Sequence, residues 1–280
     1  MKKYIYLLMS LVVFSCTTDD LAENPESLIS KKEVSTKNSN PVSLVKSWTS
    51  YGSYRGYTTY TKKFTVKVAD LAFDKQVSIY HEKVDGTWEE IPLSYSMGID
   101  DQNELWTTEY NLGGYGVSPV YDDEFVVKYE VNGNTYWDNN NGANYKMSRS
   151  DGYLLADANA NANVSVDTDY DGMSYVPYYD QNSMRVTVDV RNLAPNKEVG
   201  VVYTTDGWQT QNYFTLNFQR YWTSGPFFFI QSPNQFDIER WSGNVRFDKS
   251  LNTVEYVVVY KVNGQEYWDN NYGKNHKLSI

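Results

Sequence analysis

The sequence predicts an all-β protein built from two similar antiparallel β-sandwich domains in tandem. Strand-forming aromatics are abundant, with 26 Tyr, 11 Phe and 8 Trp among 280 residues, and long runs of helix-forming residues are missing. Short segments of alternating apolar and polar residues are separated by Asn-Gly and Asp-Gly pairs, as in strands joined by turns. A long segment of the first half recurs in the second, and the length suffices for two cores.

The first residues predict a secretory signal that ends at a lipid-bearing cysteine. Met1-Lys2-Lys3 precede an apolar run from Tyr4 to Phe14, which is the layout of a signal peptide. Cys16 is the only cysteine and therefore has no disulfide partner. The segment Val13–Cys16 resembles a bacterial lipobox, in which the signal is cut before the cysteine and the cysteine is acylated. The alternative is a simple signal peptide with an incidental cysteine.

Residues 17–41 are polar and poor in groups to bury, which predicts a flexible tether behind the signal at 1–16. Acylation of Cys16 would anchor the mature protein to a bacterial membrane through this tether. Asp19-Asp20 resembles the surface-export signal of Bacteroidota lipoproteins. We therefore expect a lipoprotein of the outer membrane, and we take display on the cell surface as a hypothesis.

An internal repeat defines the domains. Glu124–Tyr145 recurs as Glu255–His276 without a gap, at a constant offset of 131 residues. Upstream the offset shortens, to 120 between Trp88 and Trp208, so the second copy carries a net insertion that we place near Tyr221–Ile230. Two copies are too few for a solenoid, which indicates duplication of an independently folding domain.

The small polar segment Ala156–Asn163 separates the copies and is typical of a linker. We expect the first domain at 42–149, a linker at 150–162 and the second domain at 163–280.

The turn Asn132-Gly133 fixes which way the side chains of the last hairpin point. A two-residue type I′ turn needs positive φ at both positions, which Asn-Gly tolerates. Counting outward from the turn pairs Val131 with Asn134, Glu130 with Thr135, Tyr129 with Tyr136 and Lys128 with Trp137. Because opposed residues share a face, Trp137 lies with Lys128 and Glu130 on the solvated side. The buried side then holds Phe125, Val127, Tyr129, Val131 and Tyr136.

The same count from Asn263-Gly264 places Trp268 on the face of Lys261 and Glu266, and Tyr256, Val258, Tyr260 and Tyr267 on the core side. A rigid exposed aromatic suits the apolar face of a pyranose ring. The Asp-Asn-Asn segments that follow, at 138–140 and 269–271, offer groups that can bond sugar hydroxyls. The alternative is that these segments only shape a turn and that each Trp packs under a loop.

The segment Tyr136–Tyr145 resembles the closing motif of family 21 carbohydrate-binding modules, found in some glucoamylases and in the glycogen-targeting subunits of protein phosphatase one. Further segments similar to motifs of that family are Val68–Val77, Val188–Val199 and Val202–Trp208. The resemblance implies an immunoglobulin-like sandwich that binds α-glucan. It implies sugar contacts from Trp88, Trp137, Asp138, Asn139 and Asn144 in the first domain, and from Trp208, Trp268, Asp269, Asn270 and Asn275 in the second.

Two departures from the family pattern predict that ligand preference differs between the domains. His276 stands where the family has Tyr, and the first copy has His81-Glu-Lys-Val-Asp-Gly-Thr-Trp88 in place of a Thr-x-Asp-x-Trp motif. Docking to the phosphatase is not part of the expected role.

Other chemistry finds little support in the sequence. The net charge of −10 argues against nucleic acid. His81 and His276 are the only histidines, and with Cys16 as the lipid site no nucleophilic triad is indicated. The segment Asp167–Gly172 begins like a calcium loop, but Tyr178 stands where the bidentate Glu is required. We expect no enzyme activity, metal or cofactor.

These observations predict a non-catalytic lipoprotein that binds starch, glycogen or a related α-glucan, beside a separate hydrolase or importer. The rival is an adhesin or structural envelope protein whose exposed aromatics, such as Trp222 and Phe227–Phe229, bind protein partners.

Overall fold

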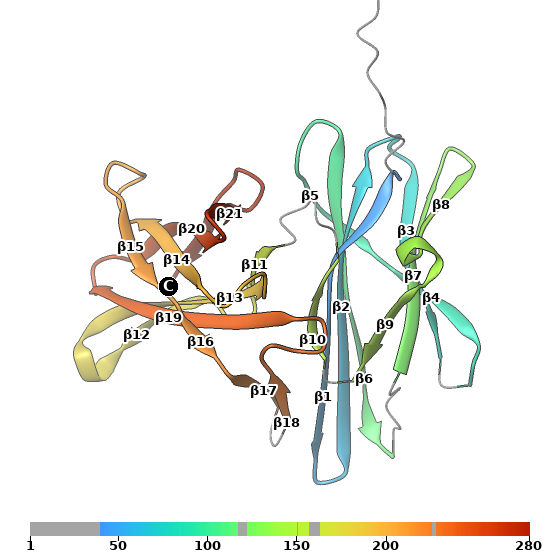
Figure 1. The fold of residues 1–280 in the computed structure, drawn as a ribbon, viewed down its shortest axis with the longest axis horizontal. Coiled ribbons are helices and arrows are strands. Elements are labelled where there is room, and N and C mark those ends of the chain that lie inside the picture. Colours follow the sequence, from blue (N-terminus) through green and yellow to red (C-terminus); the bar gives the residue numbers. More distant parts are fainter. Residues whose placement is uncertain (1–39, 84, 117–121, 150, 157–162, 226–227) are drawn as a thin grey trace, which may run out of the picture. The chain divides into compact units, whose positions relative to one another are not determined.

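The first copy folds into two antiparallel sheets that share one core (Figure 1). The computed structural model describes residues 40–280 except 84, 117–121, 150, 157–162 and 226–227. One sheet has the order β10 (Gly152–Leu155), β1 (Val42–Tyr54), β2 (Tyr57–Ala69), β6 (Asn103–Tyr115), β5 (Ser94–Gly98). The other has the order β4 (Trp88–Pro92), β3 (Lys75–Glu82), β7 (Asp122–Val131), β8 (Asn134–Asp138), with β9 (Tyr145–Ser148) paired to β7.

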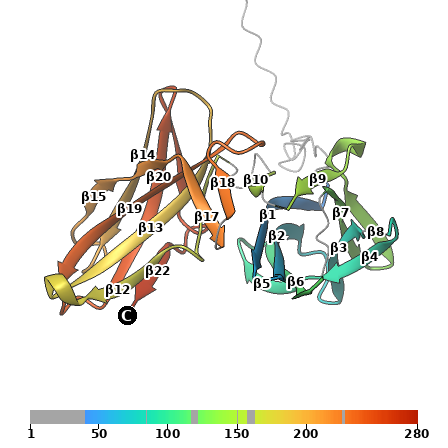
Figure 2. The same cartoon turned by 90° about the horizontal axis from the view of Figure 1, so that it is seen from below.

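The second copy repeats this design, as Figure 2 shows from a second direction. One sheet holds β11 (Val164–Val166), β13 (Gln181–Arg191), β19 (Ile238–Asp248) and β16 (Asn217–Gln219), with β12 (Gly172–Val176) on β13. The other holds β15 (Asn212–Thr215), β14 (Lys197–Thr204), β20 (Thr253–Val262) and β21 (Gln265–Asp269), with β22 (His276–Ser279) on β20. The prediction of antiparallel all-β sandwiches is confirmed.

An extra hairpin distinguishes the second copy. Its strands β17 (Tyr221–Gly225) and β18 (Phe228–Gln231) lie in the chain between β16 and β19, whereas β5 and β6 of the first copy follow each other directly. The insertion near Tyr221–Ile230 is therefore confirmed. Helical structure among the described residues is limited to short 3₁₀ turns such as Asn140–Gly142 and Pro177–Tyr179, and none of it is long and apolar enough to cross a membrane.

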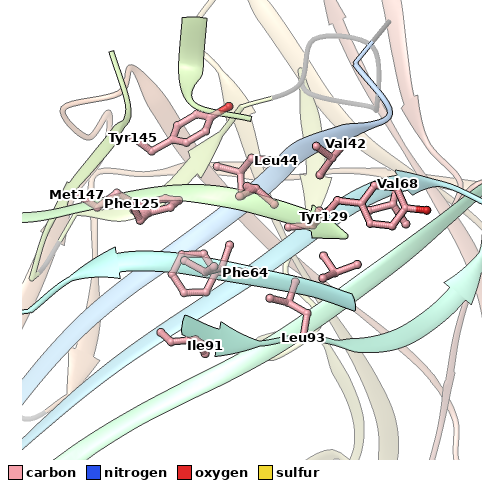
Figure 3. Close-up of a cluster of buried hydrophobic side chains, with 14 of the residues drawn as sticks. Val42, Leu44, Phe64, Val68, Ile91, Leu93, Phe125, Tyr129, Tyr145 and Met147 are labelled. Carbon is pink, nitrogen blue, oxygen red and sulfur yellow. The ribbon is translucent and has the colours of Figure 1, made fainter. Parts of the chain in front are cut away.

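Alternation along the strands builds each core. Phe64, Val66 and Val68 on β2 are at most 2% exposed, while the residues between them face outward. Figure 3 shows how Phe64 meets side chains of the opposite sheet, among them Phe125, whose ring centroid lies 5.1 Å away. In the second copy Val186, Val188 and Val190 of β13 fill the same role.

The predicted hairpins form as expected. Asn132 and Gly133 have φ of 52° and 72°, and Asn263 and Gly264 have φ of 53° and 73°. Tyr129 faces Tyr136 and Lys128 faces Trp137 across the first turn, and Tyr260 faces Tyr267 across the second, so the predicted register is confirmed.

The first sandwich extends beyond its predicted end at 149. Gly152–Leu155 forms β10 and pairs with β1 from Lys46 to Thr49, because Tyr153 and Leu155 are apolar and lie 6% and 2% exposed. The predicted linker at 150–162 therefore begins too early. β1 begins at Val42, as expected, while the signal, Cys16 and nearly all of the tether lie outside the described residues.

One tyrosine in each copy ties the two sheets together. The hydroxyl of Tyr129 on β7 donates a 2.7 Å hydrogen bond to the carbonyl of Ala69 at the end of β2. Tyr260 on β20 donates an equal bond to the carbonyl of Arg191 at the end of β13. Burial raises the pKa of Tyr260 to about 12, so this hydroxyl stays protonated as a donor.

We predict that Tyr129→Phe and Tyr260→Phe each lower the free energy of unfolding by about 1 kcal/mol, because each removes a hydrogen bond that joins the two sheets. The carbonyls of Ala69 and Arg191 keep the backbone amides of Leu71 and Leu193 as donors. Urea unfolding followed by fluorescence measures the change. Tyr136→Phe is the control, since its hydroxyl has no hydrogen-bond partner among the described residues. Equal stability of all three variants would contradict this role.

Candidate carbohydrate-binding site

The tryptophans of the two closing hairpins point to solvent. Trp137 and Trp268 are each 41% exposed, although both lie in regular strands. Their neighbours Tyr129 and Tyr260, on the opposite faces of the adjacent strands, are fully buried. The outward direction predicted from the hairpin register is therefore confirmed.

In the first copy, Trp137 forms one wall of an open hollow of about 320 Å³. Its lining residues come from strands β3, β4, β7 and β8 and from the turn after β8, namely Tyr80, Trp88, Val126, Trp137, Asn139 and Asn144. The ring of Tyr80 lies 5.2 Å from that of Trp88 and 6.0 Å from that of Trp137, so Tyr80 joins the two tryptophans into one aromatic surface. We call Tyr80, Trp88 and Trp137 the aromatic platform.

Tyr80 was absent from the predicted site. The signal for it lies in the alternation of β3, where Val77 and Ile79 are buried and the residue after Ile79 must face outward. Tyr80 lies opposite Val126 on β7. The link to Trp88 depends on the pairing of β3 with β4, which no sequence motif specifies.

A tight turn presents the two asparagines at the edge of the platform. The side-chain carbonyl of Asn139 accepts a 3.0 Å bond from the amide of Gly142, which leaves its NH₂ group as a donor. Asn144, with φ of 52°, donates its NH₂ to Glu124 at 2.6 Å, which leaves its side-chain carbonyl as an acceptor. A sugar hydroxyl both donates and accepts, so the pair is complementary to it.

The structure corrects the prediction for Asp138 and Asp269, because both carboxylates lie on the inner side of their strands. Asp138 is opposite Val127 of the core and accepts a 2.7 Å bond from the amide of Leu44 on β1. Asp269, 8% exposed, accepts a 2.8 Å bond from the amide of Val166 on β11. In each copy the aspartate fastens the closing hairpin to the other sheet, and its carboxylate does not face the exposed tryptophan.

His276 takes the place of Tyr145 in this arrangement. Tyr145 donates to Asp138 at 2.9 Å, and His276 Nε2 lies 3.0 Å from Asp269 Oδ1. The ring of Tyr145 stacks on Phe125, and that of His276 stacks on the equivalent Tyr256. The substitution preserves a structural contact, so it does not support a different ligand preference.

Trp208 is held differently from Trp88. Its indole Nε1 donates to Glu255 at 2.9 Å, and its backbone has φ of 69°. Asp206 braces the loop by accepting bonds from Thr204 and Thr210, and the Thr210 bonds lower the pKa of Asp206 to about 2. In the described part of the second copy, no ring contact joins Trp208 to Trp268.

The asparagines of the second copy keep the turn geometry. The side-chain carbonyl of Asn270 accepts a 3.0 Å bond from the amide of Gly273, as Asn139 does from Gly142. Asn275 has φ of 57°, close to that of Asn144. The structure therefore places Asn270 and Asn275 at the end of the hairpin that carries Trp268.

A second aromatic groove in the first copy was not predicted. Phe73 is fully exposed and Tyr95 is 57% exposed, and both line a hollow of about 640 Å³ with Trp106. Lys75 and Glu104 form a 2.9 Å ion pair in its wall. The exposed Phe73 follows Leu71-Ala72 in a polar turn, which is the sequence signal that could have indicated it.

The acidic segment Asp167–Gly172 is explained without a metal. The side chains of Asp167 and Asp189 both bind the guanidinium of the buried Arg240, and Asp171 accepts from the hydroxyl of Tyr256. In the described residues no cluster of His, Cys, Asp or Glu has the arrangement of a metal site. The side chains of Trp222 and Phe227 lie outside the described part of the chain.

We predict that Asp269→Ala lowers the free energy of unfolding by about 2–3 kcal/mol, because it removes a buried acceptor of charged hydrogen bonds. Burial raises the pKa of Asp269, but the bonds from His276, Val166 and Asn271 outweigh it and leave the pKa below its ordinary value. The stabilisation is therefore present above about pH 4 and is lost as the pH falls through the lower pKa of the folded state.

Urea titrations at several pH values measure this change. Wild type should lose stability more steeply than Asp269→Asn in acid, and the exposed Asp101→Asn should follow wild type. An Asp269→Asn curve that parallels wild type below pH 4 would contradict the role of Asp269.

Comparison with known proteins agrees with this geometry. The sequence model of the carbohydrate/starch-binding module, family 21, matches residues 57–148 and again 173–279. Glucoamylase 1 of Rhizopus oryzae is 37% identical over 98 residues, which are 33% of this chain and 15% of the glucoamylase. Human protein phosphatase 1 regulatory subunit 3B is 35% identical over 91 residues, 31% of each protein.

Among solved structures, the starch-binding domain of the Rhizopus oryzae glucoamylase, in complex with β-cyclodextrin and maltoheptaose, is 33% identical with a TM-score of 0.29. That match covers 39% of this chain and 94% of that domain. The curated relatives are thus matched over less than a third of their own length, as a single module. Because the family model matches both sandwiches, this chain belongs to family 21 of the carbohydrate/starch-binding modules.

Proposed function

We propose that the chain binds α-glucan, such as starch or glycogen, at the aromatic platform of the first copy and at Trp268 and Trp208 of the second. The observation that carries this proposal is the hollow in which Tyr80, Trp88 and Trp137 meet with Asn139 and Asn144 at its edge. Aromatic rings offer the apolar surface on which a sugar ring stacks. The asparagines supply one donor and one acceptor for its hydroxyls.

The choice of α-glucan rests on relatives of the same family, one of which is a starch-binding domain solved with β-cyclodextrin and maltoheptaose. Lys128 lies 5.9 Å from the ring of Trp137 and is paired with Glu90 at 2.6 Å, so the charges near the platform are compensated. A compensated surface suits a neutral polymer better than an acidic one. The groove of Phe73 and Tyr95 offers a further surface for the same polymer.

Two sites on one chain increase the apparent affinity for a polymer, because binding at one site raises the effective concentration at the other. We infer a non-catalytic role, in which the chain concentrates glucan for a separate hydrolase or importer.

We predict that Trp88→Ala with Trp137→Ala, and Trp208→Ala with Trp268→Ala, each weaken glycogen binding at least about tenfold, and that all four changes together abolish it. Affinity electrophoresis in gels containing glycogen or amylose measures the loss as faster migration. Tyr178→Ala is the control, since that side chain is 88% exposed on the 3₁₀ turn between β12 and β13 and is not among the proposed sugar contacts. Unretarded migration of wild type across several α-glucans would end the proposal.

A protein-binding role has one observation in its favour. The hairpin β17–β18, absent from the first copy, exposes Tyr221 and Phe229 at 58% each, with their rings 5.5 Å apart. An adhesin would bind through this hairpin and would keep its adhesion when the four tryptophans are replaced. Loss of glucan binding with unchanged adhesion would show both roles on one chain.

We further propose that Cys16 is acylated and anchors the protein in a bacterial outer membrane, with the tether carrying the sandwiches away from it. The basis is the lipobox-like segment alone.

We predict that Cys16→Ser moves the protein from the membrane fraction to the soluble fraction and abolishes labelling by a fatty-acid analogue, because no thiol remains to acylate. Fractionation of cells followed by immunoblotting measures the shift. Protease treatment of intact cells tests surface display, and a protein untouched by the protease would contradict it.

A further inference from the structure

Tyr213 is a large aromatic side chain on the outer surface of the second sandwich. It lies on the edge strand β15 and is 44% exposed. It is in register with Val202 of β14, next to the pair of Phe214 and Val201, whose side chains join the core. Because side chains alternate along a strand, Tyr213 points away from that core. Its ring is therefore accessible from solvent.

Three residues in register form a row on the same outer surface. Gly200 of β14 pairs with Val259 of β20, and Val259 pairs with Trp268 of β21. Gly200 is two residues from Val202 and therefore lies on the same face as Tyr213. Neighbouring strands are about 4.8 Å apart, so the row from Gly200 to Trp268 is about 10 Å long. We call Tyr213 together with Gly200, Val259 and Trp268 the apolar strip.

The ring of Tyr213 lies over Gly200. A β-carbon at position 200 would overlap the hydroxyl and the adjoining ring carbons of Tyr213, so only glycine leaves room for the ring in this position. The hydroxyl donates a 2.6 Å hydrogen bond to Glu198, and Lys261 Nζ lies 3.3 Å from the same carboxylate. The bond from Tyr213 lowers the pKa of Glu198, so the carboxylate stays charged and keeps accepting this bond at neutral pH.

Val259 forms the floor of the strip between the two rings. Its side chain shares the outward face of Trp268, yet it is only 1% exposed, so side chains on the same surface cover it. Tyr213 and Trp268 themselves remain 44% and 41% exposed. The strip therefore offers two accessible rings with a closed apolar floor between them.

In the first copy a set of bonded polar groups occupies the same place. Ser78 of β3 pairs with Lys128 of β7, and Lys128 pairs with Trp137 of β8, which makes this row the counterpart of the row that ends at Trp268. Glu90 of β4 accepts a 2.6 Å bond from Lys128 and a 3.3 Å bond from Ser78. The surface beside the tryptophan is therefore polar in the first copy.

The two copies thus differ at three neighbouring positions at once. The register of the strands equates polar residues of the first copy with apolar residues of the second, namely Ser78 with Gly200, Lys128 with Val259 and Glu90 with Tyr213. Tyr213 needs the glycine beneath it, and the valine continues the apolar surface toward Trp268. The three differences therefore make one apolar surface.

This surface has the chemistry of a site for a neutral sugar chain. Aromatic rings and an apolar floor suit the apolar faces of sugar rings. At the end of the strip the charges of Glu198 and Lys261 compensate each other, and the two groups offer an acceptor and a donor to sugar hydroxyls. A row of about 10 Å is longer than one pyranose ring, so the strip suits a chain better than a single sugar.

We propose that Tyr213 is a sugar-binding residue of the second copy, and that a chain of α-glucan runs along the apolar strip from Trp268 across Val259 onto Tyr213. This inference rests on the proposed function and deepens it, because it extends the second site beyond Trp208 and Trp268 and gives it a chain as its ligand. The first copy lacks the extension.

The test uses the full chain and maltoheptaose as the probe, with affinity measured from the amide signals of Gly200 and Trp268 in two-dimensional NMR. Both signals should shift in wild type. Tyr213→Ala should weaken binding at Trp268 about three- to tenfold, because one aromatic contact is lost. Tyr213→Phe, which keeps the ring, should retain the wild-type affinity, and the exposed Tyr178→Ala is the control.

A second variant moves the ring without removing it. Gly200→Ala places a β-carbon where the ring of Tyr213 lies, so it should weaken maltoheptaose binding at Trp268 by a similar factor. Ser78→Ala changes the corresponding position of the first copy and should leave the affinity at Trp268 unchanged. Thermal midpoints of these variants separate a loss of contact from a loss of fold.

Transfer of the strip gives a gain of binding that a misfolded protein cannot imitate. Ser78→Gly, Glu90→Tyr and Lys128→Val together should tighten maltoheptaose binding at Trp137 about three- to tenfold, since they add an aromatic contact to the first copy. Unchanged or weaker binding at Trp137 in this variant would count against the strip.

The outcomes distinguish this inference from the proposed function. Wild-type shifts at Trp268 without a shift at Gly200, or full affinity in both Tyr213→Ala and Gly200→Ala, would overturn the role of Tyr213 and leave glucan binding in place. Absence of any response to maltoheptaose at Trp137 and Trp268 would overturn both.

Discussion

The register of the closing hairpin is the constraint on which the binding surface depends. Asn132-Gly133 and Asn263-Gly264 adopt positive φ and fix the pairing of the strands on either side. Because side chains alternate along a strand, this pairing sends each tyrosine inward and each tryptophan outward. A slip of β8 by one residue against β7 would turn Trp137 toward the core and Tyr136 toward solvent.

The alternation also separates the roles of neighbouring residues in the Asp-Asn-Asn segment. Asp138 and Asp269 point inward and accept backbone amides of the opposite sheet, at Leu44 and Val166. The asparagine that follows each aspartate shapes the turn at the hairpin end. In the proposed site the aspartate stabilises the fold and the adjacent asparagine contacts sugar, so loss of binding in an aspartate variant would report on folding before it reported on recognition.

The two copies share the contacts that join their sheets but differ in the contacts of the loop tryptophan and in one part of the interior. Both copies have a tyrosine hydroxyl that donates to a backbone carbonyl of the other sheet, and an aspartate that accepts a backbone amide of that sheet. The distances are nearly equal in the two copies. The loop tryptophan does not follow this pattern, since Trp88 meets Tyr80 while Trp208 bonds to Glu255. The interior differs as well, with Lys62 beside a cavity in one copy and Met184 in the core of the other.

The sequence by itself determined the fold class, the repeat, the inserted hairpin and the outward direction of Trp137 and Trp268, because these follow from local turn chemistry and from a period of two. It also indicated family membership. Only the tertiary structure decided that Tyr80 joins the platform and that β10 completes the first sheet, since both depend on pairing between strands distant in sequence. The packing of one sheet on the other also decided that Asp138 accepts a hydrogen bond from Leu44 of the opposite sheet. The same packing placed Lys62 and Tyr60 beside a hollow.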